Sequence, residues 1–197
     1  MKIYDISQEV FSCEVFSGDP MPKIESVFSM QDGDLYNLSA FSMCAHNGTH
    51  IDAPRHFIKD GKTVDNVDLS KFVGFAYVVS HNGDVTAEDA AKMLEDARTI
   101  CADSFKKILI KGDATVTVEA ANAFADAKID LIGNESQTVG PIDAPMQVHL
   151  RLLSEEIVLL EGIRLSDVPD GVYFLNAAPI NLGGADGAPV RAILIEF

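Results

Sequence analysis

Three of the chain's five histidines lie in one short segment, His46 to His56, together with Asp52. Glycine and proline inside this segment disfavour a helix, so we expect an extended or looped chain. Alternate side chains of an extended chain share a side, which places His50 beside Asp52. A turn at Asn47-Gly48 would fold His46 back toward them.

Two imidazoles and one carboxylate form a ligand set suited to Zn²⁺, Mn²⁺ or Fe²⁺, with coordination positions left for water or substrate. His56, further along the segment, would then supply an outer contact, another ligand or a proton-transferring group near a bound water. Two other readings fit the same residues. One is an Fe(II) oxygenase built on two histidines and a carboxylate, and the other is a non-catalytic metal or ligand-binding protein with a closed metal shell.

A second pair of candidate ligands lies downstream. His149 falls in a predicted helix, and Glu161 directly follows a predicted strand. Taken alone the pair is a weak signal, because a helical histidine usually has a structural role and a glutamate at a strand end is usually solvated.

Composition limits the function classes. A chain of 197 residues, 47% of them hydrophobic, can form one domain over residues 1–197 with a full core. The formal charge of −15 would repel nucleic acid and anionic membranes. The first residues lack a signal peptide's apolar stretch, and no run approaches the ~20 apolar residues of a membrane span, so a cytoplasmic protein is expected. Three scattered cysteines suggest no disulfide framework.

Hydrophobic patterning predicts paired strands early in the chain and alternating strands and helices after residue 72. Together these predicted elements indicate an α/β domain with a mixed sheet. The predicted strands span 3–7, 10–16, 35–43, 72–80, 107–110, 129–132, 157–160, 172–176 and 190–195, and the predicted helices 86–97, 119–128 and 145–155.

The string HNGTHIDAPRHF resembles the H-x-G-T-H-x-D-x-P-x-H signature of the putative cyclase family of metal-dependent hydrolases, which includes bacterial kynurenine formamidases and isatin hydrolases. Further similarity extends over nearly the whole chain. It covers Asp5 to Ser7, Ser17 to Pro20, Asp60 to Thr63, the pair His149 and Glu161, and Gly184 to Arg191.

The resemblance implies a swivelling β/β/α fold, a homodimer, and a small-molecule substrate. It also implies one or two divalent metals, zinc first and manganese second. The activity implied is hydrolysis of an amide, either an N-formyl arylamine or a cyclic amide, or of a related ester, through metal-activated water. By position, the resemblance gives one metal to His46, His50 and Asp52, a second to Asp52, His149 and Glu161, and the role of catalytic acid/base to His56.

Some positions depart from the family pattern and leave the substrate open. Lys111-Gly112 stands where kynurenine formamidases tend to carry Arg-Thr, and the segment from Glu135 to Thr138 stands where many members show Asp-x-x-Ser. Arg191 could orient a substrate carboxylate, although a structural ion pair is the stronger expectation in so acidic a chain.

Overall fold

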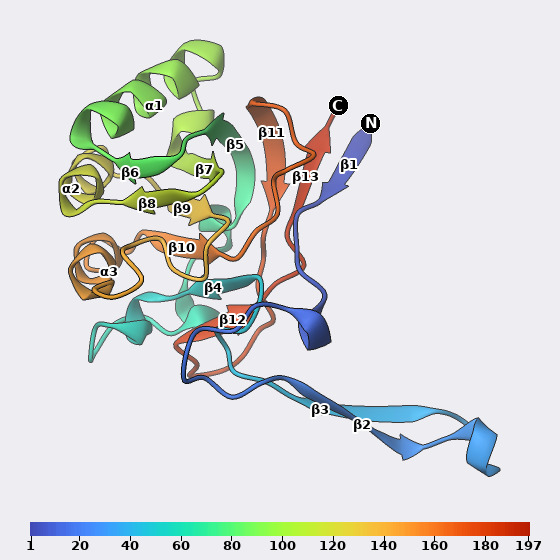
Figure 1. Ribbon diagram of the computed structural model, residues 1–197. Coiled ribbons are helices and arrows are strands. Elements are labelled where there is room, and N and C mark those ends of the chain that lie inside the picture. Colours follow the sequence, from blue (N-terminus) through green and yellow to red (C-terminus); the bar gives the residue numbers. More distant parts are fainter.

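The computed structural model describes all residues 1–197, and its centre is a nine-stranded mixed sheet with the order β1-β13-β11-β5-β7-β9-β10-β4-β12. The sheet curls, so that β4 and β12 lie below the helices while β1 and β13 form the opposite edge (Figure 1). Its strands are β1 (Lys2–Asp5), β4 (His50–Asp52), β5 (Val73–Ser80), β7 (Lys107–Lys111), β9 (Leu131–Asn134), β10 (Val158–Glu161), β11 (Gly171–Asn176), β12 (Gly187–Pro189) and β13 (Ile193–Glu196). The predicted α/β class with a mixed sheet is confirmed.

Three helices cover one face of the sheet, namely α1 (Ala87–Ile100), α2 (Val118–Asp126) and α3 (Met146–Leu153), with the short parallel pair β6 (Gly83–Val85) and β8 (Ala114–Val116) beside them (Figure 1). Strand β7 explains how both faces become buried. Ile108 and Ile110 belong to the apolar cluster on the helical side, whereas Leu109, between them, belongs to the cluster on the other side. This alternation follows from the two-residue period of a strand.

The local signals for the helices agree with the structure. Thr86 and Asp89 form the predicted capping box at the start of α1. Buried residues then recur at helical spacing on one face of α1, at Ala90, Met93, Leu94 and Ala97. All three predicted helices are present, with ends that differ by a few residues.

The first third of the chain differs more from the prediction. The predicted strand over 10–16 is wrong: the Glu9 carboxylate accepts hydrogen bonds from the backbone N–H groups of Phe11 and Ser12 and caps a 3₁₀ turn there instead. Near the C-terminus, the predicted strand over 190–195 overlaps β13 but begins three residues too early. The prediction missed β12, which ends at Pro189 and pairs with β4 at the far edge of the sheet.

A two-stranded arm projects from the body. It consists of β2 (Lys23–Phe28), which the prediction missed, and β3 (Leu38–Ser42), which lies inside the predicted strand over 35–43. The arm extends into solvent far from the main sheet (Figure 1). None of the helices in the fold has the length and hydropathy needed to cross a membrane.

Candidate metal centre and active site

Strand β4 presents two of the predicted ligands on one face. His50 and Asp52 are both buried, and the register of β4 against β10 sets Glu161 opposite His50. His50 Nε2 lies 3.4 Å from Asp52 Oδ1 and 3.4 Å from Glu161 Oε2. The strand pairing therefore brings together residues that are more than a hundred positions apart in the sequence.

A tight turn before β4 folds His46 back onto Asp52, as the sequence predicts. The Asn47 side chain accepts a hydrogen bond from the backbone of Cys44, and Gly48 adopts a φ of +62°, which favours glycine. His46 Nδ1 consequently lies 2.7 Å from Asp52 Oδ1.

Helix α3 supplies the third histidine of the cluster. The buried His149 Nε2 lies 3.3 Å from Glu161 Oε1 and 3.5 Å from Asp52 Oδ2. The structure thus brings His149 and Glu161 to the same place as the segment around residue 50, which the sequence pattern alone left open.

The outward nitrogens of two site histidines are fixed by main-chain carbonyls. His50 Nδ1 lies 3.0 Å from the carbonyl oxygen of Gly48, and His149 Nδ1 lies 2.9 Å from that of Pro145. Each carbonyl accepts a hydrogen bond from Nδ1–H, so each Nε2 faces the carboxylates. Second hydrogen bonds of this kind orient imidazoles that bind metal ions.

The donor set fits a divalent cation. Donor atoms about 2.0–2.2 Å from one ion are about 3.3–3.6 Å apart in a tetrahedral shell, which matches the separations of 3.3–3.4 Å between the Nε2 atoms of His50 and His149 and the carboxylate oxygens here. Asp52 Oδ2 is buried without a hydrogen-bond partner. A buried carboxylate oxygen without a partner is costly unless a cation satisfies it.

The electrostatics of the protein groups alone also indicate a cation site. Burial lowers the pKa of His50 and His149, but hydrogen bonds and charges from Asp52 and Glu161 outweigh it and raise each pKa to about 10. Burial raises the pKa of Asp52, whereas the nearby rings of His149, His46 and His50 hold it well below its usual range. Protons on the histidines balance the carboxylate charge in the metal-free protein.

This balance predicts a proton-linked metal affinity. A pKa of about 10 keeps His50 and His149 protonated at pH 7, and both must lose that proton to bind metal. We expect Zn²⁺ binding at pH 7 to release about two protons, and affinity to rise with pH until about pH 10. Titration calorimetry in buffers of different ionisation enthalpy measures the release; a binding enthalpy independent of the buffer would contradict it.

His56 lies beside the cluster rather than inside it. It follows β4 in a 3₁₀ turn, Pro54–His56, and its ring stacks on that of His46 with centroids 4.0 Å apart. His56 Nε2 is 4.0 Å from Asp52 Oδ2, and the ring is part-exposed. A titratable side chain at the edge of a metal cluster can exchange protons with solvent.

Asp186 is a site residue that the sequence interpretation missed. Its Oδ2 lies 3.0 Å from His46 Nε2 and 3.2 Å from His56 Nδ1. Burial raises the pKa of Asp186, but hydrogen bonds from His46 and then His56 bring it below its ordinary value. The segment Gly184 to Arg191 was part of the resemblance, yet an aspartate in a glycine-rich stretch ordinarily reads as a turn residue.

A cavity of about 250 Å³ opens over the cluster. A pocket of this size accepts a small molecule. Its wall combines the site histidines and Glu161 with aromatic, amide and hydroxyl side chains, including Phe16, Phe57, Gln137 and Thr138.

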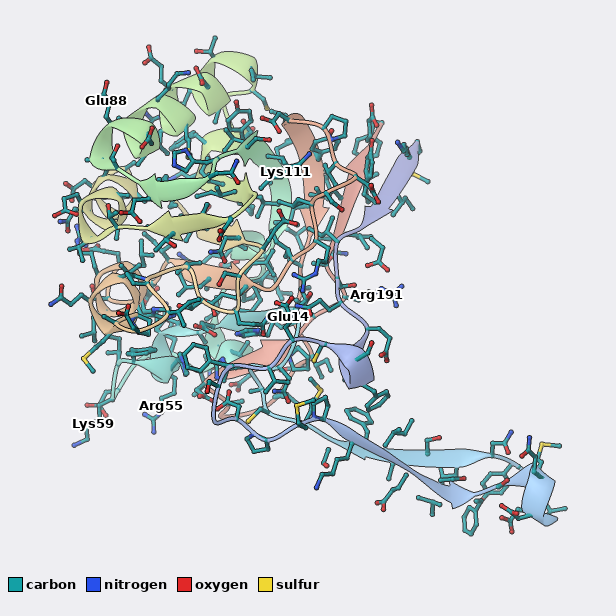
Figure 2. All side chains as sticks on the ribbon, in the orientation of Figure 1. Glu14, Arg55, Lys59, Glu88, Lys111 and Arg191 are labelled. Carbon is teal, nitrogen blue, oxygen red and sulfur yellow. The ribbon has the colours of Figure 1, made fainter.

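The remaining candidates have structural roles. Lys111 donates to the carbonyl oxygen of Val168, and the Glu135 carboxylate accepts from the backbone of Gly112 and Leu165. Arg191 Nε lies 2.9 Å from Asp5 Oδ2, so Arg191 forms the structural ion pair that was expected from the sequence. Figure 2 shows Lys111 and Arg191 on parts of the body away from helix α3.

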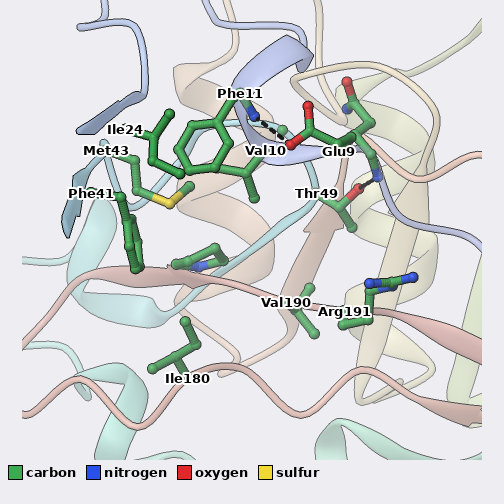
Figure 3. A pocket seen from close by; sticks show the side chains of 13 residues that line it. Glu9, Val10, Phe11, Ile24, Phe41, Met43, Thr49, Ile180, Val190 and Arg191 are labelled. Carbon is green, nitrogen blue, oxygen red and sulfur yellow. Dashed lines mark hydrogen bonds between the residues drawn. The ribbon is translucent and has the colours of Figure 1, made fainter. Parts of the chain in front are cut away.

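A second cavity, of about 520 Å³, lies where the arm leaves the body (Figure 3). It contains none of the candidate ligands, although Gly48 and Thr49, which precede His50, form part of its wall. Its lining is mainly apolar and includes Phe11, Ile24, Phe41, Met43, Ile180 and Val190.

Comparison with known proteins agrees with this geometry. The family described as Putative cyclase matches residues 4–141. A kynurenine formamidase from Salinibacter ruber is 34% identical over 98% of this chain and 97% of its own length. Another from Bacillus anthracis is 32% identical, with the same coverage of both chains.

Solved structures show the same fold. The structure titled a potential metal-dependent hydrolase with cyclase activity superposes with a TM-score of 0.80 at 29% identity, over 98% of this chain and 96% of that one. Isatin hydrolase A from Labrenzia aggregata superposes with a TM-score of 0.82 at 20% identity, over 98% and 93% of the two chains, which supports the fold alone. The chain therefore belongs to the putative cyclase family of metal-dependent hydrolases.

Proposed function

We propose that this protein hydrolyses the C–N bond of a small amide, either an N-formyl arylamine or a cyclic amide, or a related ester bond. The observation that carries the proposal is the convergence of four ligand side chains, His46, His50, His149 and Glu161, around the buried carboxylate of Asp52, whose Oδ2 has no hydrogen-bond partner. The kynurenine formamidases among its relatives support the amide. The proposed ligands are His46, His50 and Asp52 for one ion, and Asp52, His149 and Glu161 for a second.

When bound, a divalent cation lowers the pKa of a water molecule to about 7 and polarises a carbonyl oxygen. The protein groups orient the ligands and transfer the protons. The main-chain carbonyls that hold His50 and His149 keep both Nε2 atoms directed at the cluster. His56, with its Nε2 toward Asp52, takes the proton from the attacking water and then delivers one to the leaving nitrogen or oxygen.

The metal is proposed to be zinc, with manganese as the alternative. Imidazole nitrogen and carboxylate oxygen are ligands that both ions accept. The two overlapping groups of candidate ligands, which share Asp52, support one ion or two.

The purified protein tests the proposal directly. Elemental analysis should find zinc or manganese, and a panel of N-formyl arylamines, isatin, cyclic imides and lactones should include at least one compound that is hydrolysed. The rate should fall on chelation and stay unchanged without oxygen, because hydrolysis consumes only water. A rate that requires oxygen would indicate an oxygenase, and a metal-loaded protein without turnover on any panel compound would indicate a binding protein.

We also propose that the protein is a cytoplasmic homodimer. Its three cysteines are free, as is usual in a reducing compartment. The arm supports the dimer, because an isolated two-stranded ribbon is marginally stable in water, and this one exposes apolar side chains along its length. These include Ile24, Val27, Phe28, Met30, Leu35, Tyr36, Leu38 and Phe41.

The arm gives a prediction for assembly. Leu35 is 93% exposed and Leu38 43% exposed, so replacing both with serine should not disturb the core of the body. If the arm holds a second copy, the double variant should shift from dimer to monomer in light scattering coupled to gel filtration. Ile100→Ser is the matched control, since Ile100 is an exposed apolar residue at the end of α1. An unchanged mass for the arm variant would contradict an arm-mediated dimer.

A further inference from the structure

One carboxylate oxygen contacts two site histidines at the same time. Asp186 Oδ2 lies 3.0 Å from His46 Nε2 and 3.2 Å from His56 Nδ1. The two rings stack with an interplanar angle of 30°, and one nitrogen of each ring contacts the same oxygen. The contact therefore links a proposed metal ligand to the proposed acid/base.

The backbone fixes Asp186 at this place. Its carbonyl oxygen accepts a hydrogen bond from the backbone N–H of Ala53, and the next residue, Gly187, pairs with Asp52 across β12 and β4. A Cβ at Gly187 would lie 2.5 Å from His46 Cε1, so only glycine fits there. Asp186 is thus held by the sheet itself rather than by a free loop.

We propose that Asp186 is the positioning residue of the active site, which selects the ring nitrogen that each of these histidines presents to the cluster. The inference rests on the proposed function for the role of His56, and it adds a group to which neither the resemblance nor the sequence pattern gives a role.

The contact with Asp186 determines which nitrogen of His56 faces the cluster with a lone pair. Asp186 accepts the hydrogen bond from Nδ1–H, so the proton of the neutral ring stays on Nδ1. Nε2, which faces Asp52 Oδ2 at 4.0 Å, is left with its lone pair on the side of the cluster. A base needs its lone pair on that side to take a proton from water there.

The ring of His46 lies between two carboxylates. Nδ1 faces Asp52 at 2.7 Å, whereas Nε2 faces Asp186. An imidazole that gives one nitrogen to a metal keeps its proton on the other, and a carboxylate that accepts that proton fixes the ring and strengthens the ligand. One oxygen thereby sets the tautomer of both rings.

Histidine nitrogen NMR tests this without any substrate. In the zinc-loaded protein we expect His56 to carry its proton on Nδ1, and in Asp186→Ala to shift toward the Nε2–H form. Asp65→Ala is the matched control. Asp65 also binds the Gly183–Gly187 stretch, through the backbone N–H of Gly184, but the structure gives it no contact with a histidine. An identical His56 tautomer in the wild type and Asp186→Ala would overturn the proposal.

Kinetics with a substrate found in the panel supply the second readout. Loss of a group that orients a metal-bound or catalytic histidine typically costs about 10- to 100-fold in activity. We expect Asp186→Ala to lose that much in kcat/KM, Asp186→Glu to recover part of it, and Asp65→Ala to stay near the wild type. In a His56→Ala background the Asp186 substitution should cost less, because the part of its effect that passes through His56 is already lost.

Metal content separates positioning from ligation. His46, His56 and Asp186 are close enough together to hold an ion themselves. If Asp186→Ala lost one equivalent of zinc, Asp186 would be a ligand and the positioning role would be overturned. Full zinc content with a changed tautomer supports the role. A wild-type protein inactive on every panel compound would count against the proposed function, while the NMR result would still decide the role of Asp186.

Discussion

Replacing His56 with alanine is expected to lower kcat/KM by about 10²- to 10⁴-fold while the zinc content stays at the wild-type level. The expected loss is large because His56 is the only proposed group that moves protons between water and the leaving atom. Metal should be retained, since the ring lies beside the ligand cluster, with its Nε2 4.0 Å from Asp52 Oδ2. Steady-state kinetics and elemental analysis on the same preparation measure both quantities.

His81→Ala is the control for this substitution. His81 is the one histidine outside the site, and its part-buried side chain is hydrogen-bonded to the carbonyl oxygen of Asp84. It should keep full activity and full metal. If His56→Ala instead lost zinc in proportion to its activity, His56 would be a ligand and the proton-transfer role would need another residue.

The sequence predicted the local parts of the site better than the long-range ones. Alternation along an extended strand and a turn at glycine suffice to place His46, His50 and Asp52 together, because these effects act within a few residues. The convergence of His149 and Glu161 depends on the pairing of β10 with β4 and on the docking of α3. No local pattern encodes such contacts, and only the family resemblance indicated them.

The same distinction explains the errors in the fold. Helix α1 was predictable because its capping box and its apolar face are both formed by residues a few positions apart in the sequence. The segment after Gln8 looked like a strand in composition, yet the Glu9 side chain binds the backbone of Phe11 and Ser12 and ends any extended run. Asp186 was missed for a related reason, since its role comes from the pairing of β12 with β4.

Replacing Asp52 with alanine is expected to abolish both metal binding and hydrolysis. Asp52 belongs to both candidate ligand groups, so its loss removes a donor from each ion. The matched variant is Glu161→Gln, which affects the second group only and keeps an oxygen to accept the hydrogen bond from the backbone N–H of Val139. Asp52→Asn preserves the side-chain volume, so circular dichroism of the two Asp52 variants separates loss of metal from loss of fold.

The number of ions follows from comparing these variants. If the wild type holds two equivalents of zinc, Glu161→Gln should hold one and Asp52→Ala none. If the wild type holds one equivalent, its retention in Glu161→Gln would place it at His46, His50 and Asp52, and its loss would place it at Asp52, His149 and Glu161. A folded Asp52→Ala protein with wild-type zinc and turnover would refute the site, because its shared carboxylate would then hold no metal.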